Sequence, residues 1–262
     1  MKTRLDAELV RRGLARSREA ATDLIAAGSV LVSGMPASKA ATQVDAETSI
    51  TLKDDHAEFV SRGGHKLAGA LDKFTQIDVS GKTALDAGAS TGGFTDVLLK
   101  RGAKNVVAVD VGYGQLAWEL QKDERVKILD RVNVRNLTPA QVGEEIDLVV
   151  ADLSFISLKL VLPALISVAK EGADFLVMVK PQFEVGKEKL GAGGVVRDVH
   201  LRKEAVVAVA DAAFALTLGT LGVVASPLPG PSGNVEYFLW LRKGVPALLE
   251  VDLDLAIEKG PA

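Results

Sequence analysis

From residue 82 onward, apolar and polar positions fall into two kinds of segment that alternate along the chain. Short apolar runs, typical of buried strands, are separated by longer segments with helical spacing. This order predicts an α/β, Rossmann-like fold in which helices cover both faces of a doubly wound parallel sheet. The seven expected strands occupy residues 83–88, 105–112, 126–130, 146–152, 174–180, 222–228 and 235–241.

The first 58 residues show a different pattern and predict a small α+β domain. Residues 5–13 form an amphipathic helix that ends at Gly13, and Ser17 caps a second helix that runs to Gly28. Short strands are expected within residues 29–38 and 49–52. We therefore divide the chain into a domain at 1–58, a larger domain at 59–245 and a C-terminal tail at 246–262.

The apolar stretch 205–229 is long enough to span a bilayer, but its pattern favours a helix followed by a strand. It contains one charge, Asp211, and we expect Gly219 and Gly222 to divide it. The N-terminal sequence lacks the apolar region of a secretory signal. Together these features predict a cytoplasmic protein that does not act in a membrane.

Composition is that of an ordinary globular protein, with 48% hydrophobic and 25% charged residues. There is no cysteine, so disulfides and thiolate chemistry are excluded. The net charge is −3, yet residues 1–20 carry six basic and three acidic side chains. The positive charge is therefore concentrated on the first two predicted helices.

Five of the apolar runs end on an ionisable residue. These residues are Asp86, Asp110, Asp130, Asp152 and Lys180. In an open parallel sheet the carboxyl ends of the strands line the ligand crevice, so the five are candidate site residues. Asp130 is the weakest of them, because Asn133 lies close by and could take its place.

The turn after the first strand of the large domain reads Gly88-Ala89-Ser90-Thr91-Gly92-Gly93. It lacks the second glycine of the dinucleotide fingerprint, which admits a pyrophosphate. A carboxylate at Asp110 is placed to accept both ribose hydroxyls of an adenosine. S-adenosylmethionine therefore fits this loop better than a nicotinamide dinucleotide.

The segment RLDAELVRRGLARSREAATDLIAAGSVLVSG resembles the S4 RNA-binding domain. That resemblance implies a basic face that contacts structured RNA. The alternative is a solvated helix face without a ligand, which is the usual role of a charged run. The residues expected to contact RNA are Arg4, Arg11, Arg12, Arg16, Arg18 and Lys39.

Residues 60–242 resemble the FtsJ-type ribose 2'-O-methyltransferases, whose Lys-Asp-Lys-Glu tetrad is matched by Lys66, Asp152, Lys180 and Glu236. With the S4-like segment and the motifs VSRGGHKL, DAGASTGGFTD, ADLSFISL and VKPQFE, the whole chain is similar to the TlyA family. The resemblance implies methyl transfer from S-adenosylmethionine to a cytidine ribose 2'-hydroxyl of 16S or 23S ribosomal RNA, or of both.

The same resemblance implies a role for each tetrad residue. Lys180 deprotonates or orients the 2'-hydroxyl, Asp152 and Glu236 hold the lysines and the ribose, and Lys66 tunes Lys180 and positions the nucleotide. The residues expected to hold the donor are Asp86, Gly88, Ala89, Ser90, Thr91, Gly92, Gly93, Phe94, Asp110, Asn133 and Asp152.

Other functions are open at this stage. The chain could be an inactive RNA-binding factor in ribosome assembly, or a lytic protein, as the family's older haemolysin label implies. A nicotinamide oxidoreductase fits the strand and loop pattern alone. No metal site is expected, because His56, His65 and His200 have no ligand spacing. Residues 187–198 form either a lid over the RNA or a structural loop.

Overall fold

A computed structural model describes residues 3–15, 17–33, 35–45, 48–52 and 58–260 of the 262. The chain divides into two compact units, Met1–Glu58 and Phe59–Ala262. Each unit has its own hydrophobic core, so each is described by itself.

The first unit is built from two short helices and small antiparallel sheets, as its pattern predicts. Helix α1 (Leu5–Arg11) packs on α2 (Arg18–Ala26), and the Ser17 hydroxyl accepts a hydrogen bond from the Ala20 N–H. Strand β1 (Thr3–Arg4) pairs with β4 (Gln43–Val44), and β2 (Val30–Val32) lies between β3 (Met35–Pro36) and β5 (Ile50–Leu52). The core of this unit consists of Leu5, Leu9, Ala21, Ile25, Val30, Val44 and Ile50.

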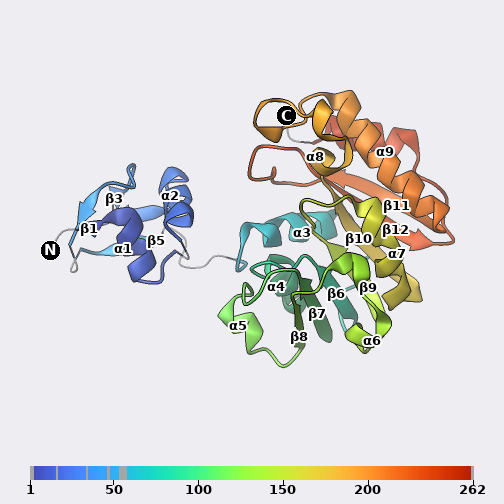
Figure 1. The fold of residues 1–262 in the computed structure, drawn as a ribbon, viewed down its shortest axis with the longest axis horizontal. Helices are drawn as coiled ribbons and strands as arrows, with labels where there is room; N and C mark the ends of the chain where they lie inside the picture. Colours follow the sequence, from blue (N-terminus) through green and yellow to red (C-terminus); the bar gives the residue numbers. More distant parts are fainter. Residues whose placement is uncertain (1–2, 16, 34, 46–47, 53–57, 261–262) are drawn as a thin grey trace. The chain divides into compact units, whose positions relative to one another are not determined.

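The second unit contains the seven expected strands in one sheet (Figure 1), in the order β11-β12-β10-β9-β6-β7-β8. Their bounds are β6 (Thr83–Ala87), β7 (Asn105–Asp110), β8 (Val126–Asp130), β9 (Ile146–Ala151), β10 (Ala169–Val179), β11 (Leu218–Ala225) and β12 (Tyr237–Lys243). The strand order reverses between β6 and β9, which makes the sheet doubly wound.

The expectation of a wholly parallel sheet is wrong for one strand. β12 runs antiparallel to both β10 and β11. The physical reason is its connection, because only the short loop 226–236 joins β11 to β12, whereas a parallel pairing needs a crossover of a dozen or more residues. The first residue of β12 therefore lies beside the last residues of β10.

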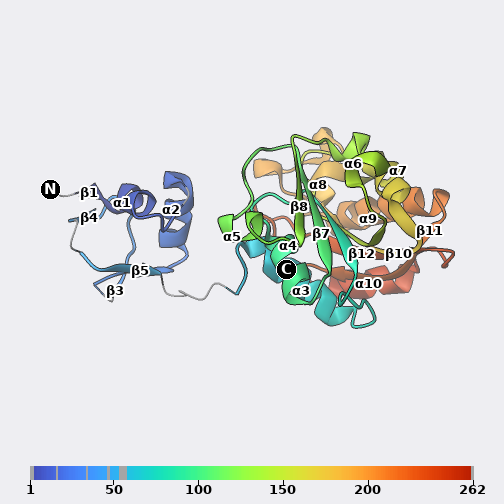
Figure 2. The same ribbon diagram turned by 90° about the horizontal axis from the view of Figure 1, so that it is seen from below.

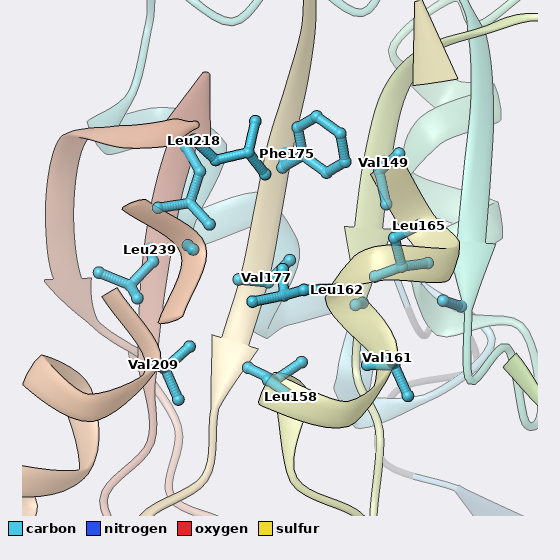
Figure 3. Close-up of a cluster of buried hydrophobic side chains, with 14 of the residues drawn as sticks. Val149, Leu158, Val161, Leu162, Leu165, Phe175, Val177, Val209, Leu218 and Leu239 are labelled. Atoms are coloured by element: carbon cyan, nitrogen blue, oxygen red, sulfur yellow. The ribbon is translucent and has the colours of Figure 1, made fainter. Parts of the chain in front are cut away.

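Helices cover both faces of the sheet, as Figure 2 shows. On one face α3 (Arg62–Lys73) and α4 (Gly93–Lys100) bury a core that includes Leu148 and Val150 of β9. On the other face α7 (Leu158–Val168) and α9 (Val199–Ala215) bury Val149 together with Phe175 and Val177 of β10 (Figure 3). Successive residues of a strand point to opposite faces, so the continuous apolar runs serve both cores. Shorter helical segments are α5 (Trp118–Gln121), α6 (Pro139–Val142), α8 (Pro181–Glu184), η1 (Val134–Asn136), η2 (Lys187–Lys189) and η3 (Ala192–Gly194).

The apolar stretch 205–229 is divided into a helix and a strand, but not at its glycines. α9 ends at Ala215, and Thr217 has a left-handed backbone with φ of 71° before β11 begins. Gly219 and Gly222 lie inside β11, where a Cβ at either position would collide with neighbouring atoms. Within the described ranges, no helix is long and apolar enough to cross a membrane.

Residues 246–262, expected to be a tail, include helix α10 (Glu250–Glu258). Leu253 and Ala256 of this helix are buried in the core that it shares with α9 and β11. The described part of this segment therefore belongs to the second unit.

Candidate active site

The strand register places the ends of five strands along one edge of the sheet. Ala87 of β6 pairs with Val109 of β7 on one side and with Ala151 of β9 on the other. Further along, β9 pairs with β10, and Val179 of β10 pairs with Tyr237 of β12. The residues that adjoin these pairs are Gly88, Asp110, Asp152, Lys180 and Glu236, so they follow one another along this edge.

Lys66 and Glu236 form a buried ion pair at this edge. The Lys66 Nζ lies 2.6 Å from Glu236 Oε2, and the two side chains are 8% and 1% exposed. Gln182 donates from Nε2 to the other Glu236 oxygen at 3.4 Å. A buried carboxylate needs such partners, because removing a charge from water is costly unless it is paired.

Lys180 and Asp152 form the second ion pair. The Lys180 Nζ lies 2.6 Å from Asp152 Oδ1 and donates a hydrogen bond of 2.9 Å to the Ser154 hydroxyl. Lys180 is 8% exposed, whereas the Asp152 side chain is 21% exposed and borders solvent. Only Pro181 separates Lys180 from Gln182, which contacts Glu236, so the four tetrad residues lie in one site.

The turn after β6 brings the chain very close to the end of β9. Gly88 has φ of +88°, and a Cβ at this position would lie 2.6 Å from the Asp152 carbonyl oxygen. A side chain is therefore excluded both by the left-handed backbone and by the neighbouring strand. Ser90 also has a positive φ, of 48°, and its N–H donates to Asp110 Oδ2 at 2.8 Å.

Asp110 holds this turn to the loop after β7, because its other oxygen accepts from the Gly112 N–H at 2.7 Å. A carboxylate has about four lone-pair positions, so the two backbone hydrogen bonds leave capacity for further donors such as ribose hydroxyls.

Asp86 lies beneath the turn and is fully buried. Its Oδ2 accepts a hydrogen bond of 2.7 Å from the Thr95 hydroxyl, while Oδ1 is a buried oxygen with no hydrogen-bond partner in the described chain. Burial, helped by the nearby Asp152 and Asp110 carboxylates and opposed by the hydrogen bonds from Thr95, raises the pKa of Asp86 to about 7.

Two family models match the chain. The FtsJ-like methyltransferase model matches residues 59–243, and the S4 domain model matches residues 3–50. A Mycobacterium tuberculosis protein named 16S/23S rRNA (cytidine-2'-O)-methyltransferase TlyA is 58% identical over 266 residues, covering 99% of this chain and 99% of that protein. The chain belongs to the TlyA family of FtsJ-like methyltransferases.

Other members of the TlyA family carry a different name. A Brachyspira hyodysenteriae protein named Hemolysin A is 36% identical to this chain, covering 89% of it and 97% of that relative. A solved structure of a haemolysin candidate from Streptococcus thermophilus is 36% identical, with a TM-score of 0.79 over 98% of this chain and 95% of that chain. The predictions of family, fold class and enzyme class are thereby confirmed.

Within the family's glycine-rich turn, several of the expected donor residues serve packing. A Cβ at Gly92 would collide with Leu120, and one at Gly93 would collide with Ser61, so close packing of the chain explains both glycines. Phe94 stacks on Phe238 in the core. Among the remaining turn residues, Ser90 is exposed, Gly88 and Thr91 are half-buried, and Ala89 is 7% exposed.

Asn133 and Asp130 lie at the far end of the same edge. The Asn133 side chain is exposed and accepts from the Arg135 N–H, which caps the short helix η1. Asp130 accepts from the Gly114 N–H at 2.9 Å. Both side chains therefore have local structural roles. Which of the two belongs to the donor site stays open.

In the first unit, two buried carboxylates hold four of the expected RNA-contacting arginines. Asp6 binds Arg4 and Arg18 at 3.0 and 2.9 Å. Glu8 binds Arg11 at 2.6 Å and Arg12 at 2.7 Å. The Arg4 hydrogen bond lowers the pKa of Asp6 well below its usual range, and that of Arg11 lowers the pKa of Glu8 to about 2.

The basic residues of this unit differ in what else they contact. Arg12 also donates to the Thr48 and Asp45 carbonyls, so it fastens α1 to that turn. The Arg11 and Arg18 side chains are each 61% exposed. Lys39 is exposed, and Arg16 lies outside the described residues.

Sequence reasoning missed three residues beside Lys180. Ser154 contacts it directly, and Glu184, four residues further along the chain, has a side chain that is 1% exposed, so burial raises the pKa of its carboxyl. Phe155 is 91% exposed with φ of +64°, and its ring lies 5.1 Å from that of Phe183. All three belong to the motifs ADLSFISL and VKPQFE. These motifs indicated that the two segments are typical of the family, but they predicted no role for the three side chains.

The segment 187–198, expected to be a lid or a structural loop, is exposed in its first half and fastened in its second. Val196 is 1% exposed, and its N–H donates to Asn234 Oδ1 at 2.9 Å. Asn234 in turn donates to the Gly194 carbonyl at 3.1 Å. These contacts give residues 194–196 a structural role and leave the function of residues 187–193 open.

Proposed function

We propose that this protein transfers the methyl group of S-adenosylmethionine to a ribose 2'-hydroxyl of a cytidine in 16S or 23S ribosomal RNA, or in both. The observation that carries the proposal is the site around Lys180. A nearly buried amine, held by Asp152 and Ser154, lies on the same sheet edge as the glycine turn of a methyltransferase family. The name of the Mycobacterium tuberculosis relative supports the choice of cytidine and of ribosomal RNA.

The residues around the glycine turn fit the donor. The close approach of Gly88 to β9 leaves backbone beside the donor position, and Asp110 has lone pairs for ribose hydroxyls. The unpartnered oxygen of Asp86 lies in a group of three carboxylates, which favours a ligand that carries positive charge. When bound, S-adenosylmethionine supplies an electrophilic methyl group on a sulfonium.

The tetrad supplies alignment and a proton acceptor. With the donor bound, a ribose 2'-hydroxyl would have to lose its proton to become methylated, so a protein group at that hydroxyl would accept or orient the proton. Lys180 is the group we assign to accept or orient that proton, and Asp152 holds its amine in place. Lys66 and Glu236, which are linked to the Lys180 segment through Gln182, position the nucleotide.

We assign the recognition of structured RNA to residues 1–58 and catalysis to residues 59–245. The four paired arginines of the first unit present guanidinium groups whose remaining donors suit phosphate oxygens. The partner is accordingly ribosomal RNA, free or within a ribosomal subunit.

The test is transfer of a labelled methyl group from S-adenosylmethionine to unmodified ribosomal subunits and to free ribosomal RNA, followed by mapping of 2'-O-methyl groups. We expect incorporation at a cytidine, and we expect Lys180→Ala to lower kcat by about a hundredfold or more with donor affinity nearly unchanged. The control is Lys170→Ala, which removes a lysine from the other end of the same strand, where it pairs with Asp147.

Two outcomes would count against the proposal. Normal turnover by Lys180→Ala would remove the tetrad assignment. Donor binding without methyl incorporation into any of these RNAs would favour an RNA-binding assembly factor instead.

A further inference from the structure

Glu184 is a buried carboxylate that joins the two segments on either side of the catalytic edge. It ends α8, which begins directly after Lys180, and its side chain is 1% exposed. It accepts a hydrogen bond of 2.6 Å from the Ser157 hydroxyl and one of 2.8 Å from the Leu158 N–H. The segment after β10 is thereby fastened to the start of α7.

The connection between β9 and α7 consists of residues 152–157, and it is held at both ends by the segment after β10. At one end Asp152 and Ser154 contact the Lys180 amine. At the other end Ser157 contacts Glu184. Lys180 and Glu184, which are four residues apart in the sequence, therefore contact the two ends of the same connection.

This connection also adopts a backbone conformation that needs support. Phe155 has φ of +64°, a left-handed conformation that costs a residue with a side chain about 1 kcal/mol or more. Its side chain is 91% exposed, so burial of this ring in a core does not hold the conformation in place. The contact of its ring with Phe183 and the hydrogen bonds at the two ends support the connection.

We propose that Glu184 is a positioning residue for methyl transfer, which holds residues 152–157 so that Ser154 stays against the Lys180 amine. The proposal rests on the function proposed above. A lysine amine on its flexible stem can rotate about a single ion pair, and the Ser154 hydroxyl gives it a second fixed contact. Glu184 itself is not assigned a contact with the RNA or with the donor.

The decisive experiment is a double-mutant cycle on the full-length protein with Glu184→Gln and Ser154→Ala. We expect each single substitution to lower kcat about tenfold or more, while the affinity for S-adenosylmethionine stays within about twofold. If Glu184 acts through Ser154, the double variant is no slower than the slower single variant by more than about twofold, because coupled residues are not additive. Ser154→Thr, which keeps a hydroxyl, should recover most of the activity.

Two further variants separate positioning from a loss of stability. Ser157→Ala removes one of the two Glu184 hydrogen bonds and should lower kcat in the same direction as Glu184→Gln, but less. Asp174→Asn changes an equally buried carboxylate in the middle of β10, where it binds Trp240 and Arg242. This control should lower the melting temperature without a comparable fall in kcat.

The outcomes distinguish this inference from the function on which it rests. Two results would overturn the role of Glu184 while leaving the methyltransferase reaction intact. One is a fall in kcat of the double variant that equals the product of the two single falls, and the other is a normal kcat in a folded Glu184→Gln protein. An inactive wild-type protein on every RNA substrate would instead reject the proposed function.

Discussion

At the scale of single residues, Asp86 makes the sharpest prediction about the proposed donor site. Its carboxyl is fully buried, and its pKa is raised from an ordinary 3.8 to about 7. Between these two values the unfolded chain has lost the proton while the folded protein keeps it. The unfolded state then binds fewer protons, so stability falls as the pH rises through this window and levels off above about pH 7.

Asp86→Asn should remove this pH dependence. The difference in free energy of unfolding between variant and wild type should shift in favour of the variant by about 2 to 3 kcal/mol when the pH is raised from about 5 to about 8. Any constant cost of the amide at this site cancels in the comparison. Urea unfolding of the donor-free proteins at the two pH values measures the difference, and an identical pH slope for both proteins would contradict the assignment.

Site residues were predictable from the pattern where they end strands, and not elsewhere. Asp110, Asp152 and Lys180 come at the ends of apolar runs, so sheet geometry alone brings them to one edge, whereas Asp86 lies inside β6, beneath the turn. Lys66 and Glu236 came only from the family resemblance. Ser154 and Glu184 act through hydrogen bonds between loops 26 or 27 residues apart, which no local pattern encodes.

At the scale of elements, the limits of prediction lie at the boundaries. Helix α9 stops before Thr217, although glycines further along were the stronger sequence signal for a break. Those glycines are needed instead because β11 packs tightly, Gly219 against the carbonyls of Val245 and Pro246 and Gly222 against Phe74. A glycine thus marks either a turn or a close contact, and only tertiary structure separates the two.

Two glycine substitutions, one in the glycine-rich turn and one in α3, test whether a glycine is required by its close contacts. Gly92 has φ of +96°, and a Cβ there would collide with Leu120 and lie 2.8 Å from Leu116. We expect Gly92→Ala to destabilise the protein by about 2 to 4 kcal/mol, through backbone strain and overpacking.

In Gly63→Ala the new Cβ lies 3.4 Å or more from its neighbours, on a helical backbone. This substitution should be neutral or stabilising by up to about 1 kcal/mol, because alanine favours a helix over glycine. Denaturant unfolding of both variants checks the pair. A destabilised Gly63→Ala together with a neutral Gly92→Ala would show that the packing described at these positions is wrong.

At the scale of the whole molecule, the net charge of −3 conceals a local excess of basic residues, six against three acidic ones within residues 1–20, that suits an RNA partner. Its arginines are not loose surface charges, because buried Asp6 and Glu8 hold them in pairs. Both carboxylates stay ionised down to acidic pH, since their pKa values are lowered by these guanidinium partners. Loss of charge on Asp6 and Glu8 therefore does not break the pairs near neutral pH.

Arg11 and Arg18 should consequently act on RNA affinity, while Arg12 should act mainly on stability. Replacing Arg11 or Arg18 by Gln removes an exposed guanidinium, and each change should weaken binding to ribosomal RNA and reduce the salt dependence, the slope of log K against log salt, by about one. Arg12→Gln breaks the contacts with Thr48 and Asp45 and should instead lower the thermal stability of the first unit. Donor affinity, which depends on the second unit, should not change in any of the three variants.

The contradicting outcome is a salt slope equal to that of the wild type in both Arg11→Gln and Arg18→Gln. The face that carries these two arginines would then not contact the phosphates, and the RNA would have to be recognised by other surfaces of the protein.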